Sequence, residues 1–312
     1  MSTALGEPRS RMTADLIGAL RWCLAHREGV AGTELADRLY VDWYLSADAS
    51  DAAVMVGVPR TEEVAPVAAY RAAHAHDAMF QPGWRVERIS SRGRLLVTDG
   101  TSSRVLNRVD VLPLARTLLP PRPGDPVQIA ARHDLVDDAG FWFTFLGEWE
   151  TKPPASVVRF YWAVRRFAAP GLVGRLTALL PRDVPAALKV GAARHLLGRP
   201  DAAVLYLSAE ATLGLVGSLR QIARELGEGL GGRTPPLALP LARGLAVAEE
   251  PADSTQSFGQ HRCMVLAEVG AALDGAEDDD TLLKHARAAL AQAGVDALHP
   301  YRSAGSRLGS DW

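Results

Sequence analysis

Lysine is the scarcest charged residue in this 312-residue chain. Only three of its 34 basic residues are lysines, namely Lys152, Lys189 and Lys284. A GC-rich genome produces such a bias toward arginine, together with many alanines, glycines and prolines, so the arginines alone do not indicate phosphate binding. The scarcity has one direct consequence, because a reaction that depends on an amine side chain has only these three candidates.

Cysteine, net charge and long apolar runs are also in short supply. The two cysteines, Cys23 and Cys263, lie in helix-like segments, which favours reduced, buried thiols of a cytoplasmic protein. No cysteine–histidine cluster has zinc spacing, so we expect no metal site. The formal net charge of −2 offers no basic field to nucleic acid or to an anionic membrane. No run of about 18 apolar residues predicts a membrane-spanning helix, and residues 1–8 lack signal-peptide features.

The periodicity of apolar residues predicts an α+β fold in three parts. Residues 1–80 are predicted as N-terminal helices, residues 81–150 as an antiparallel β meander, and residues 151–312 as a mixed α+β half. The aromatic segment 141–145 is the most hydrophobic strand, so we expect it at the centre of the meander. In the third part, residues 202–208 are predicted as a buried strand. The amphipathic segment 213–226 predicts a helix, and residues 260–273 and 281–293 are predicted as two further helices.

Glycine-rich and nucleophile motifs do not indicate a cofactor or a hydrolase site. Residues 227–232 match the bare pattern G-x-G-x-x-G, but they follow a helical segment and precede prolines. A dinucleotide site needs these glycines between a strand and a helix. The chain also contains no P-loop and no G-x-S-x-G sequence, so we expect no cofactor.

Five blocks in the second half of the chain carry a family resemblance. They are Phe160-Tyr161-Trp162, Leu188-Lys189-Val190, the segment 199–206, the segment 244–249, and Ser257-Phe258-Gly259-Gln260-His261-Arg262. In this order they resemble the Hop-A-type effector family, which comprises type III effectors of plant pathogens and relatives in actinobacterial peptide natural-product clusters. Residues 239–242 depart from the family pattern because they lack a polar residue.

The resemblance implies a role in class V lanthipeptide or thioamitide biosynthesis. In such pathways a kinase-like partner phosphorylates Ser or Thr of a precursor peptide. The effector-like protein then removes the phosphate and leaves dehydroalanine or dehydrobutyrine, to which a cysteine thiol can add. We therefore expect a cytoplasmic phosphoserine/phosphothreonine lyase whose partners are the precursor peptide and the kinase-like protein.

A lyase of this kind needs a base for the α-proton, a donor for the enolate oxygen and cations for the leaving phosphate. A neutral lysine can be the base if burial or nearby cations lower its pKa toward about 7 to 8. Lys189 is the first candidate because its apolar neighbours would partly desolvate it; the alternative is a strand lysine that points to solvent. Lys152, on the connector before two prolines, is the second candidate, as base or phosphate ligand. Lys284 has an acidic residue four positions before it on an exposed helix, so we set it aside.

Arginine suits the phosphate because its planar guanidinium can donate to two oxygens at once. Four arginines in or near the blocks are the candidate phosphate ligands: Arg159, Arg165, Arg199 and Arg262. Arg262 lies at the start of a predicted helix, where backbone N–H groups and the helix dipole favour an anion. The alternative for each is a surface salt bridge, and Arg199 with Asp201 can also be a structural ion pair that opens a strand.

The remaining polar residues of the blocks have two interpretations each. His261 is the candidate general acid or carbonyl donor, and the alternative is a structural histidine. Tyr161 is another carbonyl donor or else a core tyrosine. Ser257 is predicted as a helix N-cap.

Two other functions stay open at this point. One is a non-catalytic subunit or effector that binds a peptide or a host protein, for which the acidic run 277–280 and the edges of the meander would matter more than the charged cluster. The other is a cyclase that adds a cysteine thiol to an alkene made elsewhere. Only a lyase would release phosphate from a phosphothreonine peptide without the kinase and leave an alkene behind.

Overall fold

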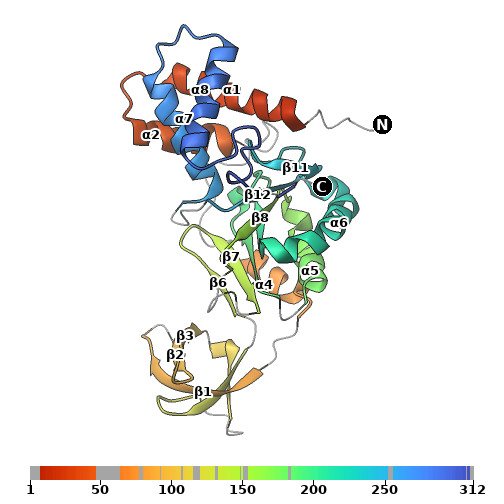
Figure 1. The fold of residues 1–312 in the computed structure, drawn as a ribbon. Helices are drawn as coiled ribbons and strands as arrows, with labels where there is room; N and C mark the ends of the chain where they lie inside the picture. The colour runs from red at the N-terminus through yellow and green to blue at the C-terminus, as the bar shows by residue number, and fades with distance from the viewer. Residues whose placement is uncertain are drawn as a thin grey trace.

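The chain folds into two antiparallel β-sheets with helices around the larger one (Figure 1). The computed structural model describes residues 8–46, 64–76, 80–91, 93–106, 108–114, 120–130, 133–147, 149, 154–181, 184–251, 256–306 and 308–309. This architecture confirms the predicted α+β class with its N-terminal helices. No helix in these ranges is long and apolar enough to cross a membrane.

Helices from the two ends of the chain pack together at one end of the molecule. α1 (Pro8–His26) and α2 (Gly32–Arg38) both lie against α7 (Phe258–Ala272), and α1 also contacts α8 (Asp279–Gln292). α2 continues directly into a π-helix, η1 (Leu39–Tyr44), which packs on α7 as well. The N-terminal part and the C-terminal part therefore share one core.

The smaller sheet follows α4 (Val64–Ala73) in the chain. Its strands are β1 (Phe80–Ile89), β2 (Leu95–Thr98), β3 (Ser103–Leu106), β4 (Val111–Pro113) and β5 (Pro126–Ala130). They pair in the order β3-β2-β1-β5-β4, all antiparallel, as predicted for this part of the sequence. Alternate residues such as Trp84, Val97 and Ile129 form a core that is separate from the main one.

The larger sheet holds strands from the rest of the chain. They are β6 (His133–Val136), β7 (Phe141–Leu146), β8 (Val157–Trp162), β9 (Ala186–Gly191), β10 (Ala203–Ser208), β11 (Leu239–Ala242) and β12 (Leu245–Glu249). Their order is β11-β12-β8-β10-β9-β7-β6, and every pairing is antiparallel. The buried strand predicted over residues 202–208 is β10, with neighbours on both sides.

The position of β7 corrects the prediction that it forms the centre of the meander. β7 pairs with β6 and β9 in the larger sheet, and not with any strand of the smaller one. The reason is that both faces of β7 have partners. Trp142 packs on Tyr70 of α4, with ring centroids 5.4 Å apart, whereas Phe141 on the other face contacts Lys189. A strand that is covered on both faces needs a sheet with a layer on each side.

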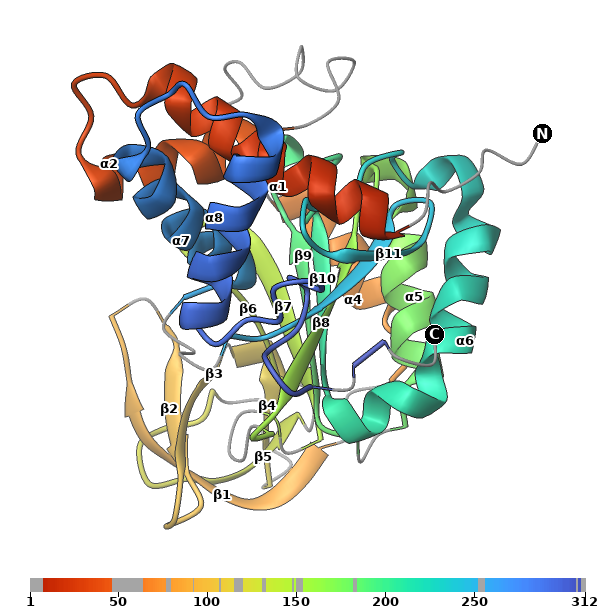
Figure 2. The ribbon, with the colours of Figure 1, turned by 45° about the horizontal axis from the view of Figure 1, so that its top comes forward.

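The two faces of the larger sheet have different covers (Figure 2). α4, α5 (Ala169–Leu179) and α6 (Ala209–Leu226) lie on one side, and α7 and α8 lie toward the other. Residues directly opposite in antiparallel strands point to the same face. One row on the side of α7 consists of Phe143, Lys189, Val204 and Tyr161, and the next row consists of Phe145, Ala187, Tyr206 and Arg159. We call the face that carries these two rows the site face.

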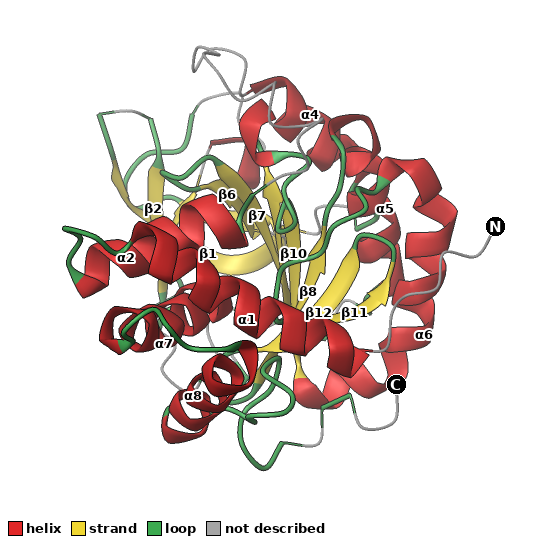
Figure 3. Cartoon of the chain, turned by 90° about the horizontal axis from the view of Figure 1, so that it is seen from above, coloured by secondary structure: helices red, strands yellow, loops and turns green. Residues whose placement is uncertain are grey.

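α1 connects the helical end to the edge of the larger sheet. Seen from above, it extends from the other helices toward β11 (Figure 3). Its Arg11 donates from Nη2 to the carbonyl of Thr234 at 3.1 Å, and its Asp15 accepts from the backbone N–H of Leu237 at 2.9 Å. Short 3-10 turns complete the described elements: η3 (Arg108–Asp110), η4 (Arg166–Ala168), η5 (Arg194–Leu196) and η6 (Gly227–Gly229).

Candidate functional site

Lys189 lies in the middle of the site face, on β9. Its Nζ is 3.7 Å from the centroid of the Phe141 ring and 5.9 Å from that of Phe143. The side chain is half-buried, and within the described residues it makes no hydrogen bond or ion pair. The alternative interpretation, a strand lysine that points to solvent, is therefore not what the structure shows.

The pKa of Lys189 is lowered below its ordinary value, and burial is the largest cause. Asp201 and Asp137 raise this pKa, whereas Arg199 and Arg159 lower it. The aromatic ring under the amine favours the charged form and so limits the shift. The net effect is an amine that releases its proton more readily than an exposed lysine does, as a general base requires.

Arg159 lies on the neighbouring row of the site face, on β8. Its guanidinium stacks on Tyr206, with Cζ 5.2 Å from the ring centroid. Its Nε and Nη2 donate to the two carboxylate oxygens of Glu250, which follows β12. Among the described residues, Nη1 of Arg159 has no partner. The carboxylate thus fixes the orientation of the arginine and leaves one edge of the fork for another acceptor.

Arg199 has the same arrangement at the start of β10. Its Nε and Nη2 each donate to Asp201 at 2.9 Å, and its Cζ is 5.9 Å from the centroid of the Phe141 ring. Lys189 and Arg199 therefore contact the same aromatic ring. The ion pair that we gave as an alternative for Arg199 is present, and its Nη1 has no partner in the described part of the chain.

Three tyrosines, Tyr40, Tyr161 and Tyr206, lie near the arginines of the cluster. Tyr161 lies on β8 in the row of Lys189, with its ring centroid 6.3 Å from that of Phe258. Burial raises the pKa of Tyr206 to about 12, of Tyr40 to about 12, and of Tyr161 above its ordinary value. At neutral pH all three hydroxyls are protonated and can donate a hydrogen bond.

A pocket of about 1070 Å³ opens at the end of the site face. Its sheet wall consists of Phe143, Phe145, Ala187 and Tyr206, so it begins at the ring that neighbours Lys189. The other lining residues come from four segments: Trp149 and 154–157, Ala209 and Leu213 of α6, Glu249 to Pro251, and the C-terminal loop with Ser303, Ser306 and Leu308. Pockets that bind small ligands typically have volumes of about 300–1,000 Å³, so this one can hold several residues of a peptide.

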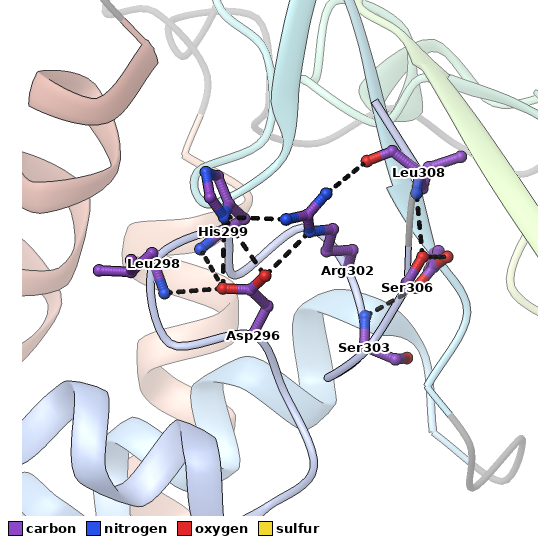
Figure 4. A network of polar contacts seen from close by, with 8 residues as sticks. Asp296, Leu298, His299, Arg302, Ser303, Ser306 and Leu308 are labelled. Atoms are coloured by element: carbon purple, nitrogen blue, oxygen red, sulfur yellow. Dashed lines mark hydrogen bonds and ion pairs between the residues drawn. The ribbon is translucent and has the colours of Figure 1, made fainter. Parts of the chain in front are cut away.

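Hydrogen bonds hold the C-terminal loop against the pocket (Figure 4). The carboxylate of Glu249 accepts from the backbone N–H of Ser303 at 2.7 Å and from the hydroxyl of Ser306. Arg302 pairs with Asp296 at 3.0 Å and donates to the carbonyl of Leu308 at 3.2 Å. The loop is therefore a tethered wall of the pocket.

Two predicted residues of α7, Arg262 and His261, contact each other. Arg262 is only 1% exposed; its Nε donates to the carbonyl of Pro300 at 2.9 Å, and its guanidinium lies over the Phe258 ring. Burial lowers its pKa to about 10. Nδ1 of His261 is 2.7 Å from Nη1 of Arg262. The structure therefore gives Arg262 the place of a core residue that anchors the C-terminal loop, and we omit both from the proposed site.

Two other predicted residues lie just before helices, Arg165 before η4 and Ser257 before α7. Arg165 follows β8 at the end opposite Arg159, where its backbone N–H donates to the carbonyl of Gly229. Lys152 lies outside the described residues. Ser257 is the N-cap of α7, in a capping box with Gln260, as we predicted.

Sequence reasoning missed the acidic partners of the site. Glu250 and Asp137 face the arginines and the lysine, yet each looks like an ordinary strand end or turn residue in the sequence. Tyr206 was placed only inside a buried strand. The pairing of β12 with β8, of β10 with β8 and β9, and of β7 with β9 brings these residues together, and no spacing in the sequence reveals it. Among the described residues, no group of three or more metal-binding side chains exists.

Comparisons with known proteins place this site within a family region. Residues 137–302 match the model of the HopA1 effector protein family, and this range contains Lys189, Arg159 and Arg199. Two solved effector structures have the same fold. One is the effector protein from Pseudomonas syringae pv. tomato strain DC3000, with a TM-score of 0.58 and 15% identity over 95% of this chain and 99% of that one. The other, from Pseudomonas syringae pv. syringae strain 61, has a TM-score of 0.53 and 16% identity over 94% and 98%. No curated protein matches the chain.

Proposed function

The chain belongs to the HopA1 effector protein family, and from the cluster around Lys189 we propose that it is a phosphoserine/phosphothreonine lyase. Its substrate would be a phosphorylated precursor peptide of lanthipeptide-type or thioamitide biosynthesis, and its product a dehydroalanine or dehydrobutyrine residue. The observation that carries this proposal is a half-buried amine with a lowered pKa beside two oriented arginines.

The proposed step is a β-elimination. The neutral amine of Lys189 takes the α-proton of the phosphorylated residue, and the electron pair of the C–H bond forms the double bond between Cα and Cβ. The bond from Cβ to the phosphate oxygen breaks, and inorganic phosphate leaves with that electron pair. Lys189 then carries the proton and loses it to solvent before the next turnover.

The arginines supply what the leaving group needs. Glu250 and Asp201 occupy the Nε and Nη2 edges, so the Nη1 groups of Arg159 and Arg199 are the donors we assign to the phosphate oxygens. The substrate carbonyl oxygen, on which negative charge develops, would accept a hydrogen bond from Tyr161 or Tyr206, whose hydroxyls are protonated at neutral pH. The protein's own partner would be the kinase-like enzyme that makes the phosphopeptide.

A synthetic phosphothreonine peptide tests the proposal without the kinase. The wild-type chain is expected to release phosphate and to form an alkene, which is detected as the loss of phosphoric acid by mass spectrometry and as thiol addition. Lys189→Arg keeps the charge but cannot act as a base, so it should not react. Lys284→Ala, on the exposed surface of α8, is the control that should keep full activity.

A non-catalytic peptide-binding subunit is the second candidate, and the charge of the cluster favours it. Three carboxylates, of Asp137, Asp201 and Glu250, oppose the two arginines, so the cluster has no excess of positive charge before a phosphate arrives. Under this function the peptide would bind with the same affinity whether or not it is phosphorylated. Equal affinity, with no phosphate released, would decide for this second candidate.

A further inference from the structure

Most of the residues that line the pocket at the end of the site face have no role in the proposed elimination. Among the lining residues that the structure describes there is no lysine, arginine or histidine. Its described surface comes mainly from aromatic, aliphatic and serine side chains, and the charged residues among them are Glu249 and Glu250. A carboxylate of a bound molecule would meet the carboxylate of Glu249 and the ion pair of Glu250 with Arg159, whereas an apolar side chain would be buried against rings.

The pocket is also a fixed distance from the proposed base. Lys189 and Ala187 lie two positions apart on β9, and Ala187 is part of the pocket wall. Two residues of a strand cover about 7 Å, and an extended peptide that lies over the sheet covers the same length in two residues. Phe143 contacts both regions, since it lies near the amine of Lys189 and also lines the pocket.

From this geometry we propose that the pocket is the subsite for the side chain two positions from the phosphorylated residue, and that it selects an apolar side chain and rejects an acidic one. The inference rests on the proposed function, because the elimination places the phosphorylated residue at Lys189. The substrate class is thereby narrowed to phosphopeptides with an aromatic or branched aliphatic residue at that position.

The polar walls support this assignment. Glu250 is engaged by Arg159, and Glu249 is engaged by Ser303 and Ser306 of the C-terminal loop. Neither carboxylate needs a cation from the substrate, so the energy of binding comes mainly from the apolar area that is buried. Leu213 of α6 stands at the mouth of the pocket with 72% of its surface exposed, in a position to cover an entering side chain.

The test uses fluorescein-labelled phosphothreonine peptides that differ only in having Phe or Asp two positions before or after the phosphothreonine. Fluorescence anisotropy measures their affinity, and phosphate release measures kcat/KM. The wild-type chain should bind the Phe peptide at least tenfold more tightly than the Asp peptide on one of the two sides. Leu213→Asp should remove most of this preference, and Ala187→Phe, which narrows the pocket at its sheet wall, should raise KM with little change in kcat.

Leu112→Asp, the same change at a leucine that is 44% exposed on the smaller sheet, is the matched control and should keep the preference. If the Phe and Asp peptides bind equally on both sides, or if Leu213→Asp keeps the wild-type preference, the pocket is not the subsite. Binding does not require turnover. A preference that Leu213→Asp removes, in a chain that releases no phosphate, would therefore support the subsite and reject the lyase.

Discussion

The environment of Lys189 shows how a single residue acquires reactivity from its neighbours. Burial lowers its pKa, the ring of Phe141 limits that shift, and charges of both signs within the cluster adjust it. The sequence identified this lysine from its apolar neighbours and from the family resemblance. It could not identify the carboxylates that orient the arginines, because Glu250 reaches Arg159 from a strand more than ninety positions away.

Asp137 offers a test of this electrostatic balance. It raises the pKa of Lys189, so Asp137→Asn should lower that pKa further, and the rise of kcat/KM with pH should move to lower pH. The direction follows because the base acts in its neutral form. The amide oxygen of asparagine can still accept from the N–H of Phe141, which Asp137 does at 2.8 Å, so the turn should be kept.

The measurement is the pH profile of phosphate release, with Asp138→Asn as the control, since the neighbouring side chain is exposed. A profile for Asp137→Asn that moves to higher pH, or that coincides with the control, would contradict this account of Lys189.

A substitution of Arg262 tests whether this residue is structural or binds the phosphate. Arg262→Met would leave the Pro300 carbonyl without its donor, at a cost of about 1–3 kcal/mol in the free energy of unfolding. Urea denaturation would show the loss. At a temperature where the variant is folded, KM for the phosphopeptide should stay within a factor of about two of wild type; a large rise in KM with unchanged stability would restore its role as a ligand.

At the scale of elements, the helices were easier to predict than the sheet. Amphipathic periodicity located α6, and the helices predicted at α7 and α8 also begin and end within a few residues of the observed ones, because a helix needs only local sequence. Which of the two sheets β7 joins depends on the strands that pair with it and on the elements that cover its faces. Both are set by residues that are distant in the sequence. The aromatic run 141–145 therefore indicated a buried strand but not its sheet.

The contact between α1 and α7 depends on one glycine. A Cβ added at Gly270 would lie 2.4 Å from Cβ of Cys23, so Gly270→Ala must push the two helices apart. We expect a loss of about 1–3 kcal/mol in the free energy of unfolding, measured by urea denaturation. Gly217→Ala on α6 is the control, because a Cβ there meets nothing within 4 Å and alanine favours a helix. Equal stability of the two variants would show that the helices are not in close contact.

At the scale of the whole molecule, the chain has two cores of unequal size. One joins both ends of the chain to the larger sheet, and the other lies inside the smaller sheet. The predicted α+β class anticipated the N-terminal helices and the antiparallel strands that follow them. It could not foresee that the first and last parts share a core, because that contact spans more than two hundred positions.

Hydrogen exchange should report the two cores separately. Amides of β1 and β5 are expected to exchange through an opening of the smaller sheet, at a lower free energy than the amides of β8 and β10 at the centre of the larger sheet. Mass spectrometry of exchanged fragments measures this. A single, equal protection for both sheets would mean that the molecule opens only as one unit.

The central claim is that the amine of Lys189 removes the α-proton, and a phosphothreonine peptide deuterated at that carbon tests it most directly. Single-turnover elimination by the wild-type chain should be slower for the deuterated peptide than for the protonated one. Lys189→Ala should lose about 10²–10⁴ in rate while it still binds the peptide. Elimination by Lys189→Ala at the wild-type rate, with the same isotope effect, would show that another group is the base.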